Sequence, residues 1–453
     1  MKRFICIKMA LIDEHSCECI KSELDLFSVP PTQTSIDESR YEKVYPLNTI
    51  TNSGPLEFRF STGDKDYLDL KNTFLYLKFN ILNNNGNTLN APVAAAAPGN
   101  ATFVYPINYF FATQFKNVEV NLGEKVISSP DTLYAYRSYL ESTLGYGNIT
   151  KEQLACGLYN KDYDDLDLHE KTIADDACEN KGAQARFLST RYSKPIEVWG
   201  RIHSELFCQP KLILNKMTMT VKFHRHDPEF SLMAFTENQR YVISISEAIM
   251  HVAYTKVTDS VREAHELALL KSPAKYPLRR INMKFFTRGQ GRSDLSEPNL
   301  HKGELPRRVV IGMVSSKAFN GSLHANPLHF KDYNLKYIQL KKNGTPLPFK
   351  EIELDYTNDL TSLGYLSLFH GTGRLFKDQK LDITPDMYQN GYSLYAFDLS
   401  QDGNDSNASL IETGELSLII KLGDALPETA VIVVYLEHEG IIEIDKDRNV
   451  KDE

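Results

Sequence analysis

Apolar and polar side chains alternate along two matching stretches of the chain, residues 217–223 and 416–422. A second matching pair, residues 118–123 and 338–344, alternates in the same way and ends in a glycine, as a hairpin turn does. A period of two is typical of a strand with one buried face. The two copies follow the same order along the chain, which predicts a duplicated β-domain.

A helix is predicted after the hairpin in each half. The apolar side chains that suggest it are Leu133, Tyr136, Leu140 and Leu144 in the first half, and Leu360, Leu363 and Phe369 in the second. In the first half, Ser129-Pro130-Asp131 has the composition of a helix start, with a capping serine and then proline. Residues 145–193 follow and are rich in aspartate. They are expected to contain an acidic, loop-like insertion of about 28 residues that the second half lacks.

These patterns predict an all-β fold. Each half offers about eight strands, one or two short helices and long loops, the inventory of a jelly roll. The expected fold is therefore a double jelly roll, two eight-stranded antiparallel sandwiches with short helices and long loops. Tyrosine (24) and phenylalanine (23) are plentiful, and aromatic residues favour strands.

The composition of the chain's two ends and of its middle differs from that of the strand-rich segments and predicts the domain boundaries. Residues before 51 sustain no strand period and hold one short apolar cluster, Leu24, Leu26 and Phe27, suited to docking on a neighbour. Ser260-Val261-Arg262-Glu263 matches a capping box and predicts a short helix, which Pro273 ends. The expected parts are an N-terminal arm at 1–50, a first jelly roll at 51–258, a linker helix at 259–272, a second jelly roll at 273–447 and a charged tail at 448–453.

Net charge limits the partners. The chain of 453 residues has a formal charge of −8, so the whole molecule does not attract nucleic acid electrostatically. A local basic cluster is the best candidate for such contacts, and it consists of Arg279, Arg280, Lys284, Arg288 and Arg292. The same residues lie on a predicted strand, so a solvated strand face is the alternative. The six cysteines are too scattered for a disulfide scaffold, and no signal peptide is expected at the start.

Candidate catalytic and metal-binding motifs are weak. His224 and His226 share one strand face, as metal ligands of cupin enzymes do, but the period places them on the polar, outward face. The other motifs lack a ligand, a glycine or a lysine that their chemistry needs. They are His15 with Cys17 and Cys19, Asp162 to Asp167, His265-Glu266, Gly289-Gln290-Gly291, and Gly371-Thr372-Gly373. The segment from Asp162 to Asp167 is expected to be a hydrated acidic loop. No catalytic residue, cofactor site or metal site is predicted, and the chain is not expected to be an enzyme.

Four segments resemble the major capsid proteins of Polinton (Maverick) elements and adintoviruses. They are Ser22 to Ile36, Tyr67 to Leu70, Asn390 to Leu399, and Val433 to Val450. The resemblance implies a double jelly-roll major capsid protein, three copies of which form a pseudo-hexagonal homotrimeric capsomer, or hexon. Such capsomers tile an icosahedral virion shell around double-stranded DNA. The implied partners are neighbouring capsomers, a single jelly-roll penton protein and minor capsid proteins.

Other functions remain open from the residues alone. A cupin-like metal-binding sandwich enzyme would use His224 and His226. A carbohydrate-binding sandwich has the same strand inventory. A domesticated, transposon-encoded copy would keep the capsid-like fold without forming virions. The duplication itself favours a structural building block.

Overall fold

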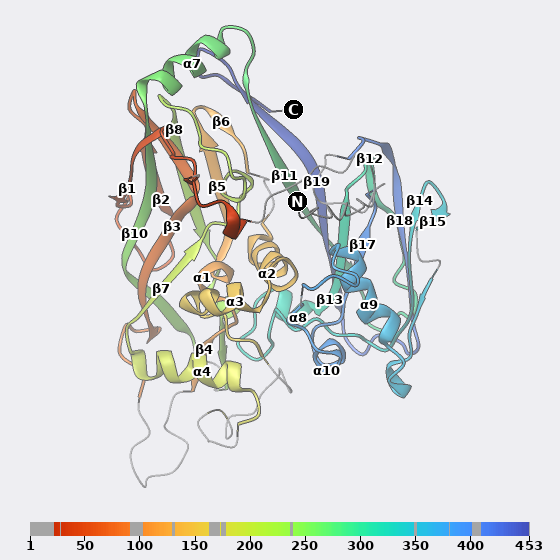
Figure 1. Cartoon of the computed structure of the whole chain (residues 1–453). Coiled ribbons are helices and arrows are strands. Elements are labelled where there is room, and N and C mark those ends of the chain that lie inside the picture. The colour runs from red at the N-terminus through yellow and green to blue at the C-terminus, as the bar shows by residue number, and fades with distance from the viewer. Residues whose placement is uncertain are drawn as a thin grey trace, which may run out of the picture.

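The computed structural model describes residues 22–27, 29–90, 103–128, 132–162, 173, 178–235, 239–347, 351–379, 381–400 and 409–452; within these, the side chains of 22 and 148–150 are not described. Among the described residues the chain is mostly β, with 42% in strands and 21% in helices. Figure 1 shows two sandwiches side by side, with the first half of the chain in one and the second half in the other. No helix in the described ranges is long and apolar enough to cross a bilayer.

The first sandwich consists of two four-stranded antiparallel sheets. One sheet has the order β1 (Ile36–Val44), β10 (Tyr241–Val257), β3 (Asp66–Asn83) and β7 (Ile196–Arg201). The other has the order β2 (Leu56–Ser61), β8 (Thr218–Arg225), β5 (Phe115–Leu122) and β6 (Lys125–Val126). A short ribbon pairs β4 (Val104–Pro106) with β9 (Leu232–Ala234).

The second sandwich consists of two sheets of five strands each. One sheet has the order β11 (Ala274–Arg288), β19 (Ala430–Ile444), β13 (Arg308–Ser315) and β17 (Leu394–Asp398), with β20 (Val450–Asp452) added beside β19. The other has the order β12 (Glu297–Glu304), β18 (Thr413–Leu422), β14 (Leu335–Lys342) and β15 (Thr345–Pro346), with β16 (Ile352–Glu353) beside β14.

The strand order is the same in both sandwiches. Strands β1, β10, β3 and β7 correspond to β11, β19, β13 and β17, and strands β2, β8, β5 and β6 correspond to β12, β18, β14 and β15. The repeated stretches of sequence fall on corresponding strands, β8 with β18 and the hairpin β5–β6 with β14–β15. The predicted duplication is therefore confirmed in three dimensions, and so is the double jelly-roll class with short helices.

The helices lie between strands and over the sheets. They are α1 (Phe110–Thr113), α2 (Tyr134–Gly145), α3 (Asn148–Leu154), α4 (Lys181–Thr190), α5 (Glu205–Cys208), α6 (Pro228–Ser231), α7 (Asp259–Leu269), α8 (Ser316–Phe319), α9 (Ser362–Gly371) and α10 (Pro385–Gln389), with single 3-10 turns at Ser22–Leu24, Ala155–Gly157, Arg191–Ser193 and Tyr356–Asn358. The two predicted helices are α2 and α9, and both follow the hairpin of their half. The suggested start at residues 129–131 lies outside the described residues, and α2 has Leu133 at its N-cap.

Three segments hold more regular secondary structure than their composition indicates. The span 145–193 is not simply loop, because α3 and α4 lie in it. The arm at 1–50 contains β1, which pairs with β10 along its length although its own side chains are mostly exposed. An edge strand of this kind is held by backbone pairing and shows little hydrophobic period, which is why the pattern missed it. The tail at 448–453 contains β20, which pairs with β19.

The linker helix is α7, which crosses one end of the first sandwich in Figure 1 and leads into β11. It begins at Asp259 with Thr258 at the N-cap, so the capping box predicted from Ser260 is misplaced. The cause is the extended backbone of Thr258, which leaves Ser260 already inside the first turn.

The sheet of β11, β19, β13 and β17 is buried on both faces at its centre. Residues 309–314 of β13 and 431–436 of β19 are all buried, without the alternation seen in β8 and β18. One face packs on the partner sheet of the second sandwich, and the other faces α2 and α5 of the first sandwich. Continuous apolar sequence is what burial on both faces requires. This arrangement places the contact between the two sandwiches inside the protein.

Candidate functional site

The candidate site is the seam, defined here as the contact between α2, α5, β7 and Asp162 of the first sandwich and β11, β13, β19, α8 and residues 320–334 of the second. Aromatic rings form one part of it. Tyr136 of α2 stacks on Phe319 with ring centroids 5.7 Å apart, and Tyr139 stacks on Phe330 at 6.3 Å. All four residues bury apolar area between the halves, and ring pairs of this kind add about 0.5–1.5 kcal/mol each beyond that burial.

A buried carboxylate forms a second part of the contact between the halves. Asp162 pairs with Arg186 at 2.5 Å, and both side chains are almost fully buried. Asn326 of the second half donates to the Asp162 carboxylate at 3.4 Å, and the Tyr392 hydroxyl donates to its backbone carbonyl at 2.9 Å. The expected hydrated acidic loop is therefore wrong at Asp162, because this carboxylate joins the two sandwiches. Residues 163–167 lie outside the described residues.

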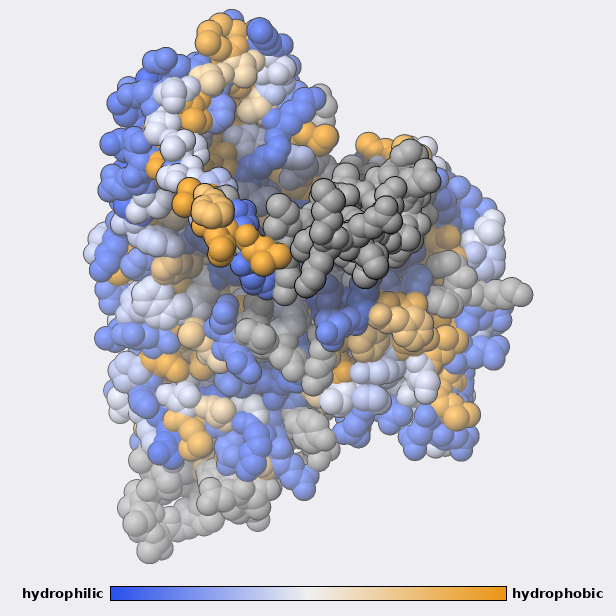
Figure 2. Space-filling view, in the orientation of Figure 1, coloured by the Kyte–Doolittle hydropathy of each residue, from blue (hydrophilic) through white to orange (hydrophobic). Residues whose placement is uncertain are grey.

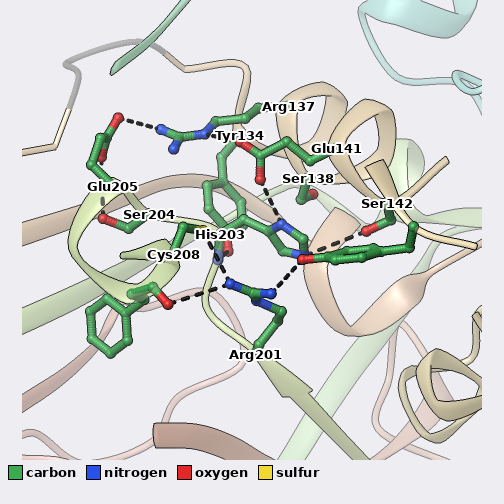
Figure 3. A network of polar contacts seen from close by, with 12 residues as sticks. Tyr134, Arg137, Ser138, Glu141, Ser142, Arg201, His203, Ser204, Glu205 and Cys208 are labelled. Atoms are coloured by element: carbon green, nitrogen blue, oxygen red, sulfur yellow. Dashed lines mark hydrogen bonds and ion pairs between the residues drawn. The ribbon is translucent and has the colours of Figure 1, made fainter. Parts of the chain in front are cut away.

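Figure 3 shows the polar network beside α2. Arg137 donates to Glu205 at 2.8 Å and to Glu141 at 3.0 Å, one turn further along the helix. Glu141 also accepts from Nδ1 of His203 at 2.7 Å. Burial raises the pKa of Glu141, but Arg137 and His203 outweigh it and hold that pKa at about 2. Burial lowers the pKa of His203, so the ring is neutral and Glu141 is ionised at neutral pH.

This network has the residue types of a hydrolase triad, but its serine and histidine are not accessible from solvent. His203 lies between Glu141 and two hydroxyls: Tyr109 donates to its Nε2 at 2.9 Å, and Ser142 Oγ lies 3.5 Å from the same atom. Both Ser142 and His203 have no exposed surface. A nucleophile needs a substrate beside it, and no substrate reaches this serine. The residues come from distant positions, so sequence motifs could not reveal them. They hold α2 against α5 and the residues between β7 and α5.

A cavity of about 440 Å³ lies along the seam and is rich in arginine. Its charged lining residues are Arg137, Arg201, Arg279, Arg308, Arg374, Glu141 and Glu437. Glu437 is almost fully buried between Arg279 at 3.3 Å and Arg308 at 3.2 Å. Residues from both sandwiches contribute, so the cavity exists only when the halves are docked. No motif in the sequence indicated this cluster.

The two histidines of the cupin-like motif do not meet. His224 lies on β8 and contacts Glu119 of β5 at 2.8 Å. The strand ends at Arg225, so His226 leaves the alternation and stacks on Phe230 with ring centroids 3.8 Å apart. Burial lowers the pKa of His226 to about 3. Across the described residues no cluster of three or more His, Cys, Asp or Glu could hold a metal. His15, Cys17 and Cys19 fall outside those residues.

The remaining motifs have packing roles. His265 of α7 contacts the Tyr67 hydroxyl at 3.0 Å, and Glu266 pairs with Arg448 at 2.6 Å. A Cβ on Gly371 would lie 2.5 Å from the backbone of Ala396, so this glycine allows α9 to pack closely on β17. The Gly289 to Gly291 segment is a turn after β11, with Gly291 at a φ of +83°.

The basic cluster on β11 is largely neutralised by neighbouring groups. Arg279 pairs with Glu437, Arg280 pairs with Asp452, and Arg288 pairs with Glu297 at 2.7 Å. Lys284 donates to the backbone carbonyl of Leu300 at 3.1 Å. These pairs favour a paired strand face over a surface that binds DNA. Arg279 differs from the others because it also lines the seam cavity.

Comparisons with known proteins agree with this architecture. No protein-family model matches the chain. A Caenorhabditis elegans protein, uncharacterized protein F54H12.2, is 28% identical over 432 residues, which cover 93% of this chain and 98% of that protein. A chain in the cryo-EM structure of the Sputnik virophage superposes with a TM-score of 0.66 at 10% identity, covering 98% of this chain and 94% of that chain.

Two major capsid proteins are similar in the same way. The Faustovirus protein gives a TM-score of 0.57 at 8% identity, with 94% of this chain and 92% of that chain covered. The mavirus protein gives a TM-score of 0.54 at 11% identity, with 99% of this chain and 96% of that chain covered. At sequence identities this low, the structural similarity shows the fold, and the role has to be argued separately. The chain therefore has the double jelly-roll fold that is found in major capsid proteins of virophages and giant viruses.

Proposed function

We propose that the chain is a major capsid protein that builds the shell of a virus-like particle, and that it is not an enzyme. The observation that carries this proposal is the pairing of two sandwiches with the same strand order in one chain, joined by a buried seam. Structures with the same fold across nearly the whole chain include proteins named as major capsid proteins. Ser142 and His203 of the buried network have no exposed surface, which argues against hydrolytic chemistry there.

The proposed assembly is a homotrimer, or hexon. Three chains with two similar sandwiches each give six similar lobes, which suits a pseudo-hexagonal capsomer in an icosahedral shell. The segment before β1 supports contacts between neighbouring capsomers, because Leu24, Leu26 and Phe27 are 70%, 77% and 97% exposed. Figure 2 shows an orange strip where Figure 1 draws the red start of the chain. Exposed apolar patches of this kind are typical of contact surfaces.

The proposed lineage is that of Polinton (Maverick) and adintovirus capsid proteins, with double-stranded DNA inside the shell. A penton protein, minor capsid proteins and neighbouring capsomers would be the partners in the virion. The relative of nearly equal length in Caenorhabditis elegans favours a second candidate, a domesticated copy carried in an animal genome. The two candidates share the fold and differ in whether particles form.

Light scattering and electron microscopy of the expressed chain test both candidates. The proposal expects a species of about 155 kDa, three times the 51.5 kDa chain, and particles at higher concentration. A stable monomer at micromolar concentration would contradict the capsid proposal. Trimers without particles, even when co-expressed with a penton protein, would favour the domesticated copy. Bound metal at His224 and His226, or a hit on a glycan array, would instead support the enzyme or the carbohydrate-binding alternative.

A further inference from the structure

The outer face of the sheet of β1, β10, β3 and β7 carries a cluster of aromatic rings. Phe74 of β3 lies at its centre and stacks on His251 of β10 with ring centroids 5.1 Å apart, while the next residue, Leu75, has no exposed surface and points into the sandwich. The rings of Tyr41 and Trp199 lie 5.5 Å and 5.6 Å from that of Phe74. Tyr41 is 57% exposed and Trp199 is 36% exposed. The outward face of an antiparallel sheet is ordinarily polar, so this cluster, called here the aromatic face, is typical of a contact surface.

The corresponding sheet of the second sandwich has the same face covered. By strand order, β1, β10, β3 and β7 correspond to β11, β19, β13 and β17. The outer face of the latter sheet is one wall of the seam, where Val310 and Tyr435 line the cavity together with Leu140 of α2. The aromatic face is therefore the counterpart, in the first sandwich, of a surface that the second sandwich buries. In Figure 1, β1 and β10 lie on the side of the first sandwich that faces away from the second.

Helix α9 is the counterpart of α2, and it is covered less completely. Nearly every residue of α2 is buried, because both sandwiches pack around it. In α9 the buried set is Leu368 and three small residues, Gly364, Ser367 and Gly371. Leu363 is 37% exposed, and Leu366, about one turn further along, is partly exposed on the same side of the helix. A helix that is apolar on several sides is expected to be covered on more than one, so this α9 surface, defined by Leu363 and Leu366, lacks the second layer that α2 has.

We propose that the aromatic face of one chain packs on the α9 surface of a second copy, so that the seam is repeated between chains. Within a chain, the sheet of the second sandwich packs on α2 of the first. Between chains, the corresponding sheet of the first sandwich packs on α9 of the second. The two surfaces are different, so the contact is heterologous, and such contacts close into rings when the rotation between copies allows it. The inference rests on the proposed homotrimer and names the surfaces that form it.

Tyr41→Glu and Leu363→Glu test the two surfaces separately, by light scattering of the full-length protein at micromolar concentration. Both side chains are exposed within the chain, so each variant should fold, which circular dichroism checks. A charge buried in the contact should weaken it by at least about thirtyfold. The unaltered protein should then have a mass of about 155 kDa, three times 51.5 kDa, and each variant the mass of a single chain. Leu267→Glu is the matched control, because Leu267 is 63% exposed on α7, which belongs to neither surface, and it should leave the trimer intact.

A mixture of the two variants tests whether the surfaces contact each other. Each variant keeps the surface that the other has lost, so one intact contact forms per pair, and a heterodimer of about 103 kDa, twice 51.5 kDa, is expected. A mixture that stays monomeric overturns the inference, and so does a trimer that survives either substitution or dissociates equally with Leu267→Glu. In these cases the unaltered protein is still a trimer and the proposed assembly stands. An unaltered protein that is itself monomeric overturns the trimer and the inference together.

Discussion

Replacing Glu141 by glutamine tests whether the buried network stabilises the fold through charge. The carboxylate accepts from Arg137 at 3.0 Å and from His203 at 2.7 Å, and its side chain is 16% exposed. Glutamine keeps the shape and one acceptor oxygen but removes the negative charge. Among the residues that the structure describes, Arg137 then retains only Glu205 as an ionic partner.

The expected loss follows from the pKa of Glu141. That pKa is about 2 in the folded chain, against an ordinary value of 4.5. A difference of about 2.5 in pKa corresponds to about 3 kcal/mol of free energy of unfolding. Because the folded pKa is the lower one, this stability is fully present above pH 4.5 and is lost as the pH falls towards 2. Glu141→Gln should therefore cost about 3 kcal/mol at pH 7 and only about 1 kcal/mol at pH 3.

Urea unfolding at a fixed chain concentration measures this loss, because association would make stability depend on concentration. Fluorescence of Trp199, the single tryptophan of the chain, reports unfolding of the first sandwich. Glu229→Gln is the control, since the Glu229 side chain is 38% exposed and lies 4.0 Å from its nearest cationic neighbour, Arg240. It should change stability by less than about 0.5 kcal/mol. An equal deficit for Glu141→Gln at pH 7 and pH 3, or none at pH 7, would refute the argument.

Three further predictions concern packing and the start of the chain. Gly371→Ala should cost about 1–3 kcal/mol in urea unfolding, because the added Cβ overlaps the backbone of β17, whereas Gly289→Ala, with open space around it, should be tolerated. Tyr136→Phe should raise stability by up to about 1 kcal/mol, because the buried hydroxyl has no hydrogen-bond partner among the described residues; a lower melting temperature would contradict this. Deleting residues 1–34 should leave trimers in light scattering, because β1 is retained. Deleting residues 1–45 removes β1 and exposes the edge of β10, so soluble aggregates are expected instead of trimers.

The repeated strands could be predicted because they have one buried face. In β8, Met219, Val221 and Phe223 point inward while Thr220 and Lys222 are partly exposed, so the period of two is visible in the sequence. Strand β1 could not be found in this way, because its stability comes from backbone pairing with β10. The helices α3 and α4 were missed because acidic residues between them dominate the local composition.

The seam was beyond sequence reasoning for another reason. Arg137 and Glu205 are 68 positions apart, and Asp162 and Asn326 are 164 positions apart. No local spacing links such pairs, and each residue on its own is typical of a surface. The sequence pattern placed both histidines on the outward face of a strand. This is correct for His224, but His226 departs from the strand period because β8 ends one residue earlier.

The sheet that is buried on both faces constrains how this protein can change over time. In β8 and β18 every second position faces outward, so half of each strand is open to neutral substitution. In the centres of β13 and β19 both faces of the strand are packed, so neither the odd nor the even positions can accept neutral substitutions. Among descendants of this chain, we expect β13 and β19 to drift most slowly and without alternation. The sheets that contain β8 and β18 should accumulate differences at every second residue. The spacing of substitutions along a strand therefore shows whether one or both of its faces are packed.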